Sequence, residues 1–302
     1  MATIYTQADS NTRKTWFLIT GFLVFIMALG FFFSYALQDG GVIFYIAIFF
    51  SIFTSFGSYW WSDKIVLAMY KAEPIEHNKN PELYHIVENL CITAGLPVPK
   101  IYIIPEMQPN AFATGRDKNH AVVAVTQGLL NRLDKSELQG VLAHEMSHIG
   151  NKDMLLSTVV AILAGTIAIL ANMFMRVSFW GGGRGSNDDN GRAGAILMIL
   201  GIVAAILAPI AATIVQLAVS RKREFLADAS AVLLTRYPEG LARALEKISS
   251  DSSPMKVTND ATASLFIDSP YKGKQKTNWF IKLFSTHPPI EERIKILRGM
   301  EI

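Results

Sequence analysis

The sequence predicts a mainly α-helical membrane protein with a small β-sheet, and three observations lead to this fold class. First, the chain of 302 residues is 51% hydrophobic and only 18% charged, which is too apolar for an ordinary soluble protein of this size. Second, four uncharged apolar runs are each about 20 residues or longer, the length that a helix needs to cross a bilayer. Third, the polar regions read mainly as helices, with only two short strand-like segments.

The first two apolar runs predict an N-terminal transmembrane hairpin over residues 1–61. They cover residues 16–37 and 42–61 and are rich in Phe and other large apolar residues. The second run ends in Tyr-Trp-Trp at residues 59–61, which is typical of the boundary between membrane and water. We therefore expect both helices to span the bilayer.

The other two apolar runs predict a second transmembrane hairpin over residues 154–219. They cover residues 155–175 and 193–219 and are rich in Ala and Gly, so a pair of buried helices is the alternative. With four transmembrane helices, the polar residues fall into two halves of one domain, residues 62–153 and 220–302.

Basic residues near the runs predict the orientation of the chain in the membrane. Arg13 and Lys14 precede the first run, residues 38–41 carry no basic residue, and Arg-Lys-Arg follows the fourth run at 221–223. Basic residues favour the cytoplasmic side, so we expect a multi-pass protein of the inner or plasma membrane whose polar domain faces the cytoplasm. Three arginines between residues 176 and 192 argue mildly against this orientation.

The composition also bears on redox state and on nucleic-acid binding. The single cysteine, Cys91, allows no intramolecular disulfide, which fits a domain that faces the reducing cytosol. The net charge is only +3, and basic and aromatic residues form no common stripe. We therefore predict the lipid bilayer, and no nucleic acid, as a partner.

The first polar region predicts a helix, two strands and a second helix. A helix over about 82–94 ends at the Gly- and Pro-containing residues 95–99. Strands are predicted at 100–104 and 121–125, with the sequence Asn-Ala-Phe-Ala-Thr-Gly between them at 110–115.

The second predicted helix has clear signals at both ends. Asp134 can cap it, and Glu137 can reach back to complete a capping box. Gly150 and Asn151 are a plausible end. The apolar residues that recur at helical spacing are Leu138, Val141, Leu142 and Met146.

This helix contains the sequence His-Glu-Met-Ser-His, an H-E-x-x-H motif. His144 and His148 lie one turn apart on the same face, where both imidazoles can reach one zinc ion. Glu145 then lies beside the open coordination position and can act as a general base toward water. The alternative is a chance match on an ordinary amphipathic helix, and a catalytic site needs a third protein ligand.

Glu224 is the strongest candidate for the third ligand. Glu224 and Asp228 are four residues apart on a helix predicted to run through Leu234, so both point to one side. Asp228 can hydrogen-bond the outer nitrogen of a ligating histidine such as His144. A charged helix face with Arg–Glu and Lys–Glu pairs is the alternative, and spacing leaves both open. Three other histidines read as ordinary surface or hydrogen-bonded residues: His77, His85 and His120.

The C-terminal polar region predicts two more helices with a loop between them. One helix covers residues 238–248, and the last begins after His287-Pro288-Pro289. Residues 249–277 are rich in Ser, Thr and Asp and are predicted to form a mobile loop. Residues 181–192 are predicted to form a Gly-rich loop between the third and fourth apolar runs.

Nearly the whole chain resembles the HtpX-type heat-shock metallopeptidases, bacterial relatives of the CAAX prenyl proteases. The N-terminal hairpin and the H-E-x-x-H helix carry part of this resemblance. Three further sequences appear in the right order: Asn-Ala-Phe-Ala-Thr-Gly at 110–115, Ser-Arg-Lys-Arg-Glu with Ala-Asp within 220–228, and Ser-Thr-His-Pro-Pro at 285–289 with Arg293.

The resemblance implies a zincin-like (gluzincin) domain with one Zn²⁺ per chain. It implies zinc ligands at His144, His148 and Glu224, and the general base at Glu145. It further suggests that His287 stabilises the oxyanion, a role for which a surface loop histidine is the alternative.

Two further residues have roles by resemblance alone. Arg293 is expected to brace the carboxylates of the site, with an ordinary surface arginine as the alternative. The resemblance also implies that Asn110 binds the backbone of the substrate. By analogy with zincin proteases, an edge strand is expected to pair with the extended substrate.

The implied function is a membrane-bound zinc endopeptidase of protein quality control and the stress response. Its expected substrates are misfolded or damaged membrane proteins, and it can cooperate with another membrane protease. One alternative is a prenyl-type protease that processes C-termini, although four spans are few for enclosing a lipid. The other is a non-catalytic metal-binding scaffold, which would leave Glu145 without a role and lacks the cysteines usual in structural sites.

Overall fold

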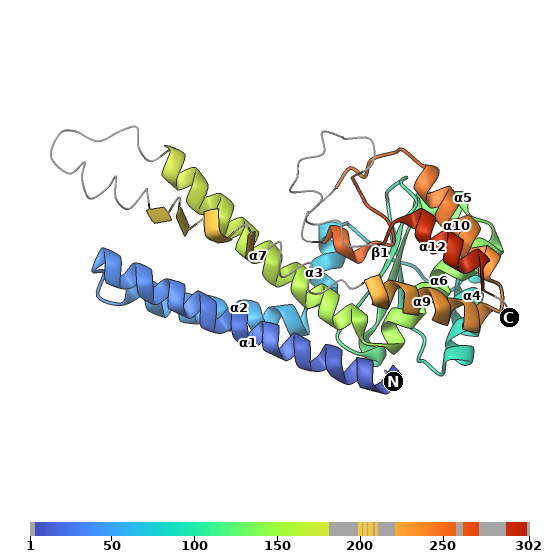
Figure 1. Ribbon diagram of the computed structural model, residues 1–302, viewed down its shortest axis with the longest axis horizontal. Helices are drawn as coiled ribbons and strands as arrows, with labels where there is room; N and C mark the ends of the chain where they lie inside the picture. Colours follow the sequence, from blue (N-terminus) through green and yellow to red (C-terminus); the bar gives the residue numbers. More distant parts are fainter. Residues whose placement is uncertain are drawn as a thin grey trace.

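The computed structural model joins a polar domain to a set of long helices that extend from one side of it. Figure 1 shows α1, α2 and α7 running away from the domain, which contains most of the other labelled elements. Both ends of the chain lie at the domain (Figure 1). The structure describes residues 4–180, 199–200, 202–203, 205–207, 209–210, 221–257, 262–271 and 288–300.

The long helices are α1 (Ile4–Leu37), α2 (Val42–Trp60) and α7 (Asp153–Trp180). They confirm the first three apolar runs as helices long and apolar enough to cross a membrane. Within the described residues, the segments that meet this criterion are Asp9–Leu37, Val42–Trp60 and Asp153–Arg176. The fourth predicted span, residues 193–219, lies largely outside the described residues, as does the loop predicted at 181–192.

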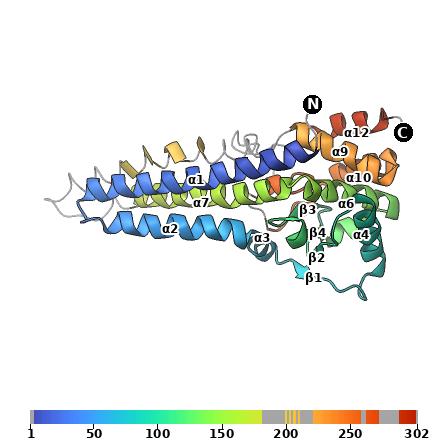
Figure 2. The same ribbon diagram turned by 90° about the horizontal axis from the view of Figure 1, so that it is seen from below.

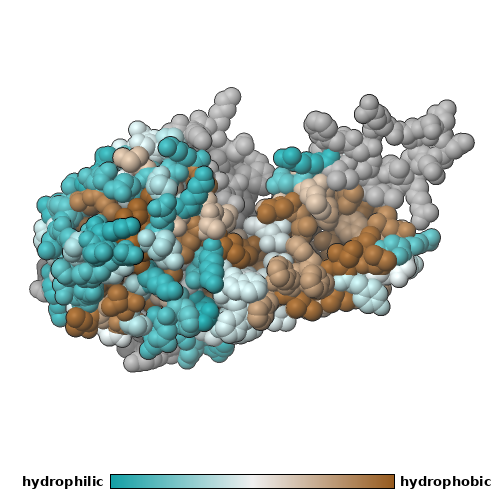
Figure 3. All heavy atoms as spheres, turned by 180° about the vertical axis from the view of Figure 1, so that it is seen from behind, coloured by the Kyte–Doolittle hydropathy of each residue, from teal (hydrophilic) through white to brown (hydrophobic). Residues whose placement is uncertain are grey.

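These three helices pack against one another and turn a hydrophobic surface outward. Phe22 of α1 is buried in one cluster with Val159 of α7, and Figure 2 shows α1, α7 and α2 side by side. On the outer faces Phe17 and Phe49 are largely exposed. In Figure 3 hydrophobic residues gather over these helices, whereas the surface of the domain is mainly hydrophilic. Such a surface belongs in a bilayer, and the chain is a membrane protein.

Four strands form one mixed sheet in the order β1, β2, β4, β3. β2 runs parallel to β4, whereas β1 and β3 are antiparallel to their neighbours and lie at the two edges. The strand predicted at 100–104 is confirmed, and the one predicted at 121–125 is confirmed with a shift of one residue. The edge strand β3 was not predicted. The strands are β1 (Glu73–Pro74), β2 (Lys100–Ile104), β3 (Ala111–Thr114) and β4 (Val122–Thr126).

Helices from both polar regions pack around the sheet. Those predicted at 82–94, at 238–248 and after Pro289 are confirmed within a few residues. The helices are α3 (Ser62–Met69), α4 (Pro81–Ala94), α5 (Gln127–Arg132), α6 (Lys135–Gly150), α9 (Arg221–Thr235), α10 (Pro238–Ser250) and α12 (Ile290–Arg298), with short 3-10 helices η1 (Lys118–His120) and η3 (Ala263–Leu265).

Helix α6, which carries the H-E-x-x-H motif, starts at the predicted capping box. The Asp134 carboxylate accepts hydrogen bonds from the N–H groups of Ser136 and Glu137. The Glu137 carboxylate accepts from the N–H of Asp134 at 2.9 Å, and also from Lys247 of α10 at 2.7 Å. The helix start is therefore fixed twice, once locally and once by a neighbouring helix. Asn151 ends the helix as predicted.

Helix α6 approaches α10 closely at Gly140. A Cβ atom on Gly140 would lie 2.7 Å from the main-chain nitrogen of Leu241 and 2.9 Å from its Cα. Main-chain atoms cannot move aside without moving the helix, so this position requires glycine.

Gly140→Ala is therefore expected to destabilise the domain by roughly 1–3 kcal/mol, the usual cost of overpacking. Chemical unfolding of the detergent-solubilised protein, followed by intrinsic fluorescence, measures this change. Gly150→Ala on the same helix is the matched control, because its Cβ would meet no atom within 4 Å. Equal stabilities of the two variants would contradict the close approach of α6 and α10.

Residues 262–271 are packed into the domain, contrary to the mobile loop predicted over residues 249–277. Phe266 is fully buried, and its ring centroid lies 4.9 Å from that of Tyr70 and 5.1 Å from that of Phe112. The prediction is wrong here because a short apolar sequence anchors a segment whose overall composition is polar.

Candidate active site

Helix α6 turns both histidines of the motif toward the same point. The Nε2 atoms of His144 and His148 are 3.1 Å apart, and the two rings meet edge to face. One helical turn separates the residues, so the fold of α6 alone produces this pair. His144 is buried, and His148 is partly buried.

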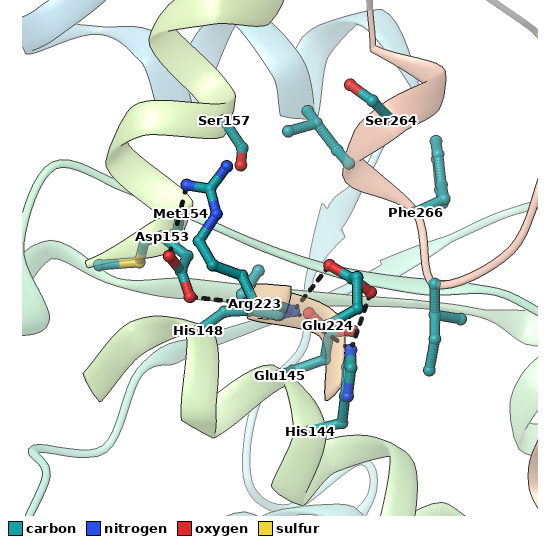
Figure 4. A pocket seen from close by; sticks show the side chains of 13 residues that line it. His144, Glu145, His148, Asp153, Met154, Ser157, Arg223, Glu224, Ser264 and Phe266 are labelled. Atoms are coloured by element: carbon teal, nitrogen blue, oxygen red, sulfur yellow. Dashed lines mark hydrogen bonds and ion pairs between the residues drawn. The ribbon is translucent and has the colours of Figure 1, made fainter. Parts of the chain in front are cut away.

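Glu224 of α9 faces the two histidines from the opposite side. Its carboxylate oxygens lie 3.8 Å from Nε2 of His144 and 3.7 Å from Nε2 of His148. The ligand atoms of all three residues lie within 4.8 Å of one another and could hold a metal ion. Figure 4 shows Glu224 above the pair, with Glu145 beside it. In the sequence, the long helix α7 lies between α6, which carries the two histidines, and α9, which carries Glu224.

The outer nitrogens of both histidines are held by carboxylates. Nδ1 of His144 lies 2.9 Å from Asp228, which is the predicted partner. Nδ1 of His148 lies 3.2 Å from Asp153, which was not predicted. Each ring is therefore oriented with Nε2 pointing inward, the arrangement that metal-binding histidines require.

Arg293 of α12 binds the carboxylate that holds His144. Its side chain is 0% exposed and donates two hydrogen bonds to Asp228, at 2.9 and 2.7 Å. Its guanidinium also lies 3.9 Å from Glu224. Burial raises the pKa of Asp228, but the charge of Arg293 together with the hydrogen bonds from His144 and Arg293 outweighs burial and lowers that pKa to about 2. Asp228 therefore stays ionised beside His144.

Asp153 is held in turn by two buried side chains, Asn11 of the N-terminal helix α1 and Arg223 of α9. The side-chain amide of Asn11 in α1 donates to Asp153 at 2.7 Å and to the carbonyl of Asn151 at 3.1 Å. Arg223 of α9 lies 3.5 Å from Asp153 and 3.4 Å from Oδ1 of Asn11. This series of side-chain contacts, from Asn11 through Asp153 to His148, connects the first membrane helix to the site.

The sequence offered one usable sign for Asp153 and none for Asn11. Asp153 is an acidic residue at the start of an apolar run, five residues after His148, where a charge is unusual without a partner. Asn11 lies 142 positions away from Asp153. Nothing local distinguishes Asn11 from any other polar residue before a membrane span.

The electrostatics of the site favour a cation. The carboxylates of Glu145, Glu224, Asp153 and Asp228 outnumber the two guanidinium groups around the histidines. Burial lowers the pKa of His148, but the hydrogen bond that its ring donates to Asp153 and the charges of Glu224, Asp153 and Glu145 outweigh burial and raise it to about 9.

The donor set fits zinc. Two imidazole nitrogens and one carboxylate are the protein ligands of one common class of catalytic zinc site. In this structure those three groups face one another, and both imidazoles keep their other nitrogen on a carboxylate. Burial raises the pKa of Glu145, which brings this carboxylate closer to the range useful for a general base.

The space at the histidines is a cavity of about 30 Å³. It is lined by the site residues, by Ala113 of the edge strand β3 and, on the far side, by residues 264–267 (Figure 4). The N–H of Ile267 donates to the carbonyl of Ala111 in β3 at 3.1 Å. The cavity therefore has room for a water molecule or an ion but not for a peptide.

The remaining predicted site residues have different outcomes. Asn110 is fully buried; its amide donates to the carbonyl of Asp268 at 2.8 Å, and its Oδ1 accepts from the N–H of Ala111 at 3.1 Å. In this conformation its side chain binds the protein's own main chain, and its role toward substrate stays a prediction. His287 lies outside the described residues, so its role also stays a prediction.

An edge strand beside two histidines and a glutamate, in a domain attached to membrane helices, defines a membrane metalloprotease. The model of peptidase family M48 matches residues 77–301. The chain belongs to peptidase family M48, and it is accordingly a hydrolase of the metalloprotease class.

Curated relatives match the chain over almost its full length. It is 46% identical to a protein named Protease HtpX homolog from Caldanaerobacter subterraneus subsp. tengcongensis, over 99% of both chains. It is 49% identical to a protein of the same name from Pyrococcus furiosus, over 86% of each chain. The crystal structure of S. mikatae Ste24p aligns with a TM-score of 0.49 and 19% identity, covering 97% of this chain and 66% of that one.

Proposed function

We propose that the protein is a zinc endopeptidase with one catalytic Zn²⁺ per chain, held by His144, His148 and Glu224. One observation carries the proposal: three ligand atoms from two helices converge, with the outer nitrogen of each histidine on a carboxylate. Asp228 and Asp153 orient the rings, and Arg293 keeps Asp228 ionised. When bound, zinc supplies a Lewis acid that polarises the scissile carbonyl and acidifies water.

The residues of the chain then move the protons. Glu145 lies in the cavity beside the three ligands, so it accepts a proton from the attacking water and passes it to the leaving amine. An extended peptide pairs with the edge strand β3. In this structure the main-chain carbonyl of Ala111 in β3 already accepts a hydrogen bond from the N–H of Ile267. Peptide entry therefore requires residues 264–267 to move away from β3.

Removing the metal tests this proposal. Treatment of the purified protein with a strong zinc chelator is expected to stop hydrolysis of unfolded casein, because the carbonyl is then no longer polarised. Adding zinc back in slight excess is expected to restore the rate, whereas adding Mg²⁺ is not, because Mg²⁺ prefers oxygen ligands. Full activity in metal-free protein would contradict a zinc mechanism.

Asn11→Ala and Asp153→Asn are each expected to weaken zinc binding by about 10 to 100-fold, because loss of an outer partner loosens the ligand. Competition with a chromophoric chelator measures this affinity independently of activity. Asp9→Asn is the matched control, since Asp9 lies on the same helix as Asn11 but is exposed. Unchanged zinc affinity in both variants would rule out a positioning role for the contact between α1 and the site.

The position of the site suggests its substrates. Asp153, which holds His148, is also the first residue of a candidate membrane span, so the site lies at the base of the membrane helices. The resemblance to HtpX-type peptidases and the names of the relatives then favour cleavage of misfolded or damaged membrane proteins under stress, in cooperation with another membrane protease. We infer a multi-pass protein of the inner or plasma membrane with a cytoplasmic site.

Substrate trapping in cells tests this finer assignment. The Glu145→Gln protein is expected to retain membrane proteins, preferentially after stress, and a tag on the N-terminus is expected to resist external protease in intact spheroplasts. Trapping of soluble proteins alone would contradict the assignment. The prenyl-processing alternative is not favoured, because the curated relatives are named Protease HtpX homolog. The scaffold alternative is not favoured, because Glu145 lies in the cavity beside the three candidate ligands.

A further inference from the structure

Outside the catalytic site, a second group of histidines and a carboxylate lies on the surface of the domain. The ligand atoms of His77, His85 and Glu88 all lie within 4.8 Å of one another. Nε2 of His77 is 3.8 Å from Oε1 of Glu88, equal to the separation of His144 and Glu224 in the catalytic cluster. Both groups contain two imidazoles and one carboxylate. The surface group therefore offers the same donors at a similar spacing.

Two of these side chains are placed by helix α4. His85 and Glu88 are three residues apart, so they are neighbours on one face of the helix. The start of α4 is fixed, because the side chain of Asn80 accepts a hydrogen bond from the N–H of Leu83 at 3.1 Å. The two donors therefore sit on a rigid element.

The third side chain is brought over the helix by the loop between β1 and α4. The hydroxyl of Tyr84 donates to the carbonyl of Ile75 at 2.7 Å, and the N–H of Ile75 donates to the carbonyl of Ile101 in β2 at 3.1 Å. The ring of His77 lies 5.0 Å from that of Tyr84 and 5.3 Å from that of His85. The loop thus holds His77 against α4 even though its side chain faces solvent.

Exposure and charge suit a hydrated cation. The side chains of His77 and Glu88 are 52% and 39% exposed, so an ion can enter and keep water as its remaining ligands. The carboxylate of Glu88 supplies negative charge beside the two imidazoles. Two imidazoles select Zn²⁺, Ni²⁺ or Cu²⁺ over the oxygen-preferring Mg²⁺ and Ca²⁺.

We propose that His77, His85 and Glu88 form a second transition-metal site, separate from the active site. It binds Zn²⁺ more weakly than the catalytic cluster, because among the described residues no carboxylate holds the outer nitrogens of its histidines. Bound metal ties the loop at His77 to α4. Helix α4 in turn packs on the catalytic helix, where Cys91 contacts Met146 at 3.7 Å. Metal at this site therefore stabilises the domain.

Metal counting on the full-length protein in detergent tests the proposal. After equilibrium dialysis against free Zn²⁺, elemental analysis is expected to find two zinc ions per chain in the wild type, one for each group. The His77→Ala/His85→Ala variant is expected to keep only the tightly bound one. His120→Ala is the matched control, an exposed histidine outside the group, and is expected to keep both.

Thermal unfolding supplies a second readout that separates this site from the active site. Zinc added beyond one equivalent is expected to raise the Tm of the wild type but not that of the double variant, while casein hydrolysis stays equal in both. Conversely, Glu224→Ala is expected to lose the tight zinc and keep the weak one. A single zinc in the wild type, or a second zinc that persists in the double variant, would overturn the proposal without touching the active site.

Discussion

Glu145→Gln is expected to abolish peptide-bond hydrolysis while leaving zinc bound. Glu145 is buried in the cavity beside the three candidate ligands, and glutamine keeps its shape but cannot accept a proton. General-base catalysis contributes about 10² to 10⁴-fold, so the rate of casein cleavage is expected to fall by at least about 100-fold. Zinc content is expected to stay at the wild-type value, because Glu145 is not one of the ligands.

The control for this variant is Glu82→Gln, an exposed glutamate in the first turn of α4. It is expected to cleave casein at the wild-type rate with wild-type zinc content. Comparable cleavage by the Glu145→Gln protein would remove Glu145 from the mechanism. Loss of zinc together with activity would instead make this residue part of the metal site.

Glu224→Ala is expected to remove both the catalytic zinc and the activity. With two histidines left, the metal has protein ligands from α6 alone, and Arg293 loses its contact with Glu224. The loss of zinc affinity is expected to exceed the about 10 to 100-fold that follows from losing an outer partner. Competition against a chromophoric chelator measures it in the purified protein.

Glu239→Ala is the control for this second variant, because Glu239 is an exposed carboxylate paired with Arg298 on the domain surface. It is expected to retain zinc and activity. If Glu224→Ala kept both, the third ligand would have to be another residue, and the structure would then describe a different state of the site.

Local signals explain what could be predicted from the sequence. Helix α6 was predicted with its capping box because Asp134 and Glu137 lie within one turn of the helix start. The membrane helices followed from run length, and the pair His144 and His148 from helical spacing. Even Glu224 and Asp228 depended on a local i, i+4 relation, with the family resemblance deciding between two interpretations.

Non-local contacts explain what was missed. The edge strand β3 is only four residues long, and it is stabilised by pairing with β4, which follows after a turn. Its sequence alone therefore gave no sign of a strand. Asn11 reaches Asp153 through the packing of α1 near the start of α7. Residues 262–271 look like a polar loop until Phe266 is seen between Tyr70 and Phe112.

The packing of residues 262–271 gives Asn110 a definite place in the molecule. The side-chain oxygen of Asn110 accepts a hydrogen bond from the N–H of Asp268 at 3.3 Å, and its side-chain NH₂ donates one to the carbonyl of Asp268. The main chain of a paired strand makes the same two kinds of hydrogen bond. The edge of β3 is therefore partly satisfied by the protein itself. A substrate that uses this edge has to compete with a bound segment of the chain.

Anomalous diffraction at the zinc edge, from crystals of the full-length protein, would locate the catalytic zinc directly. We expect a strong anomalous peak at about 2.0–2.2 Å from Nε2 of His144, Nε2 of His148 and a carboxylate oxygen of Glu224. No peak at these three residues in zinc-loaded, active protein, or a peak there without Glu224 as a ligand, would contradict it.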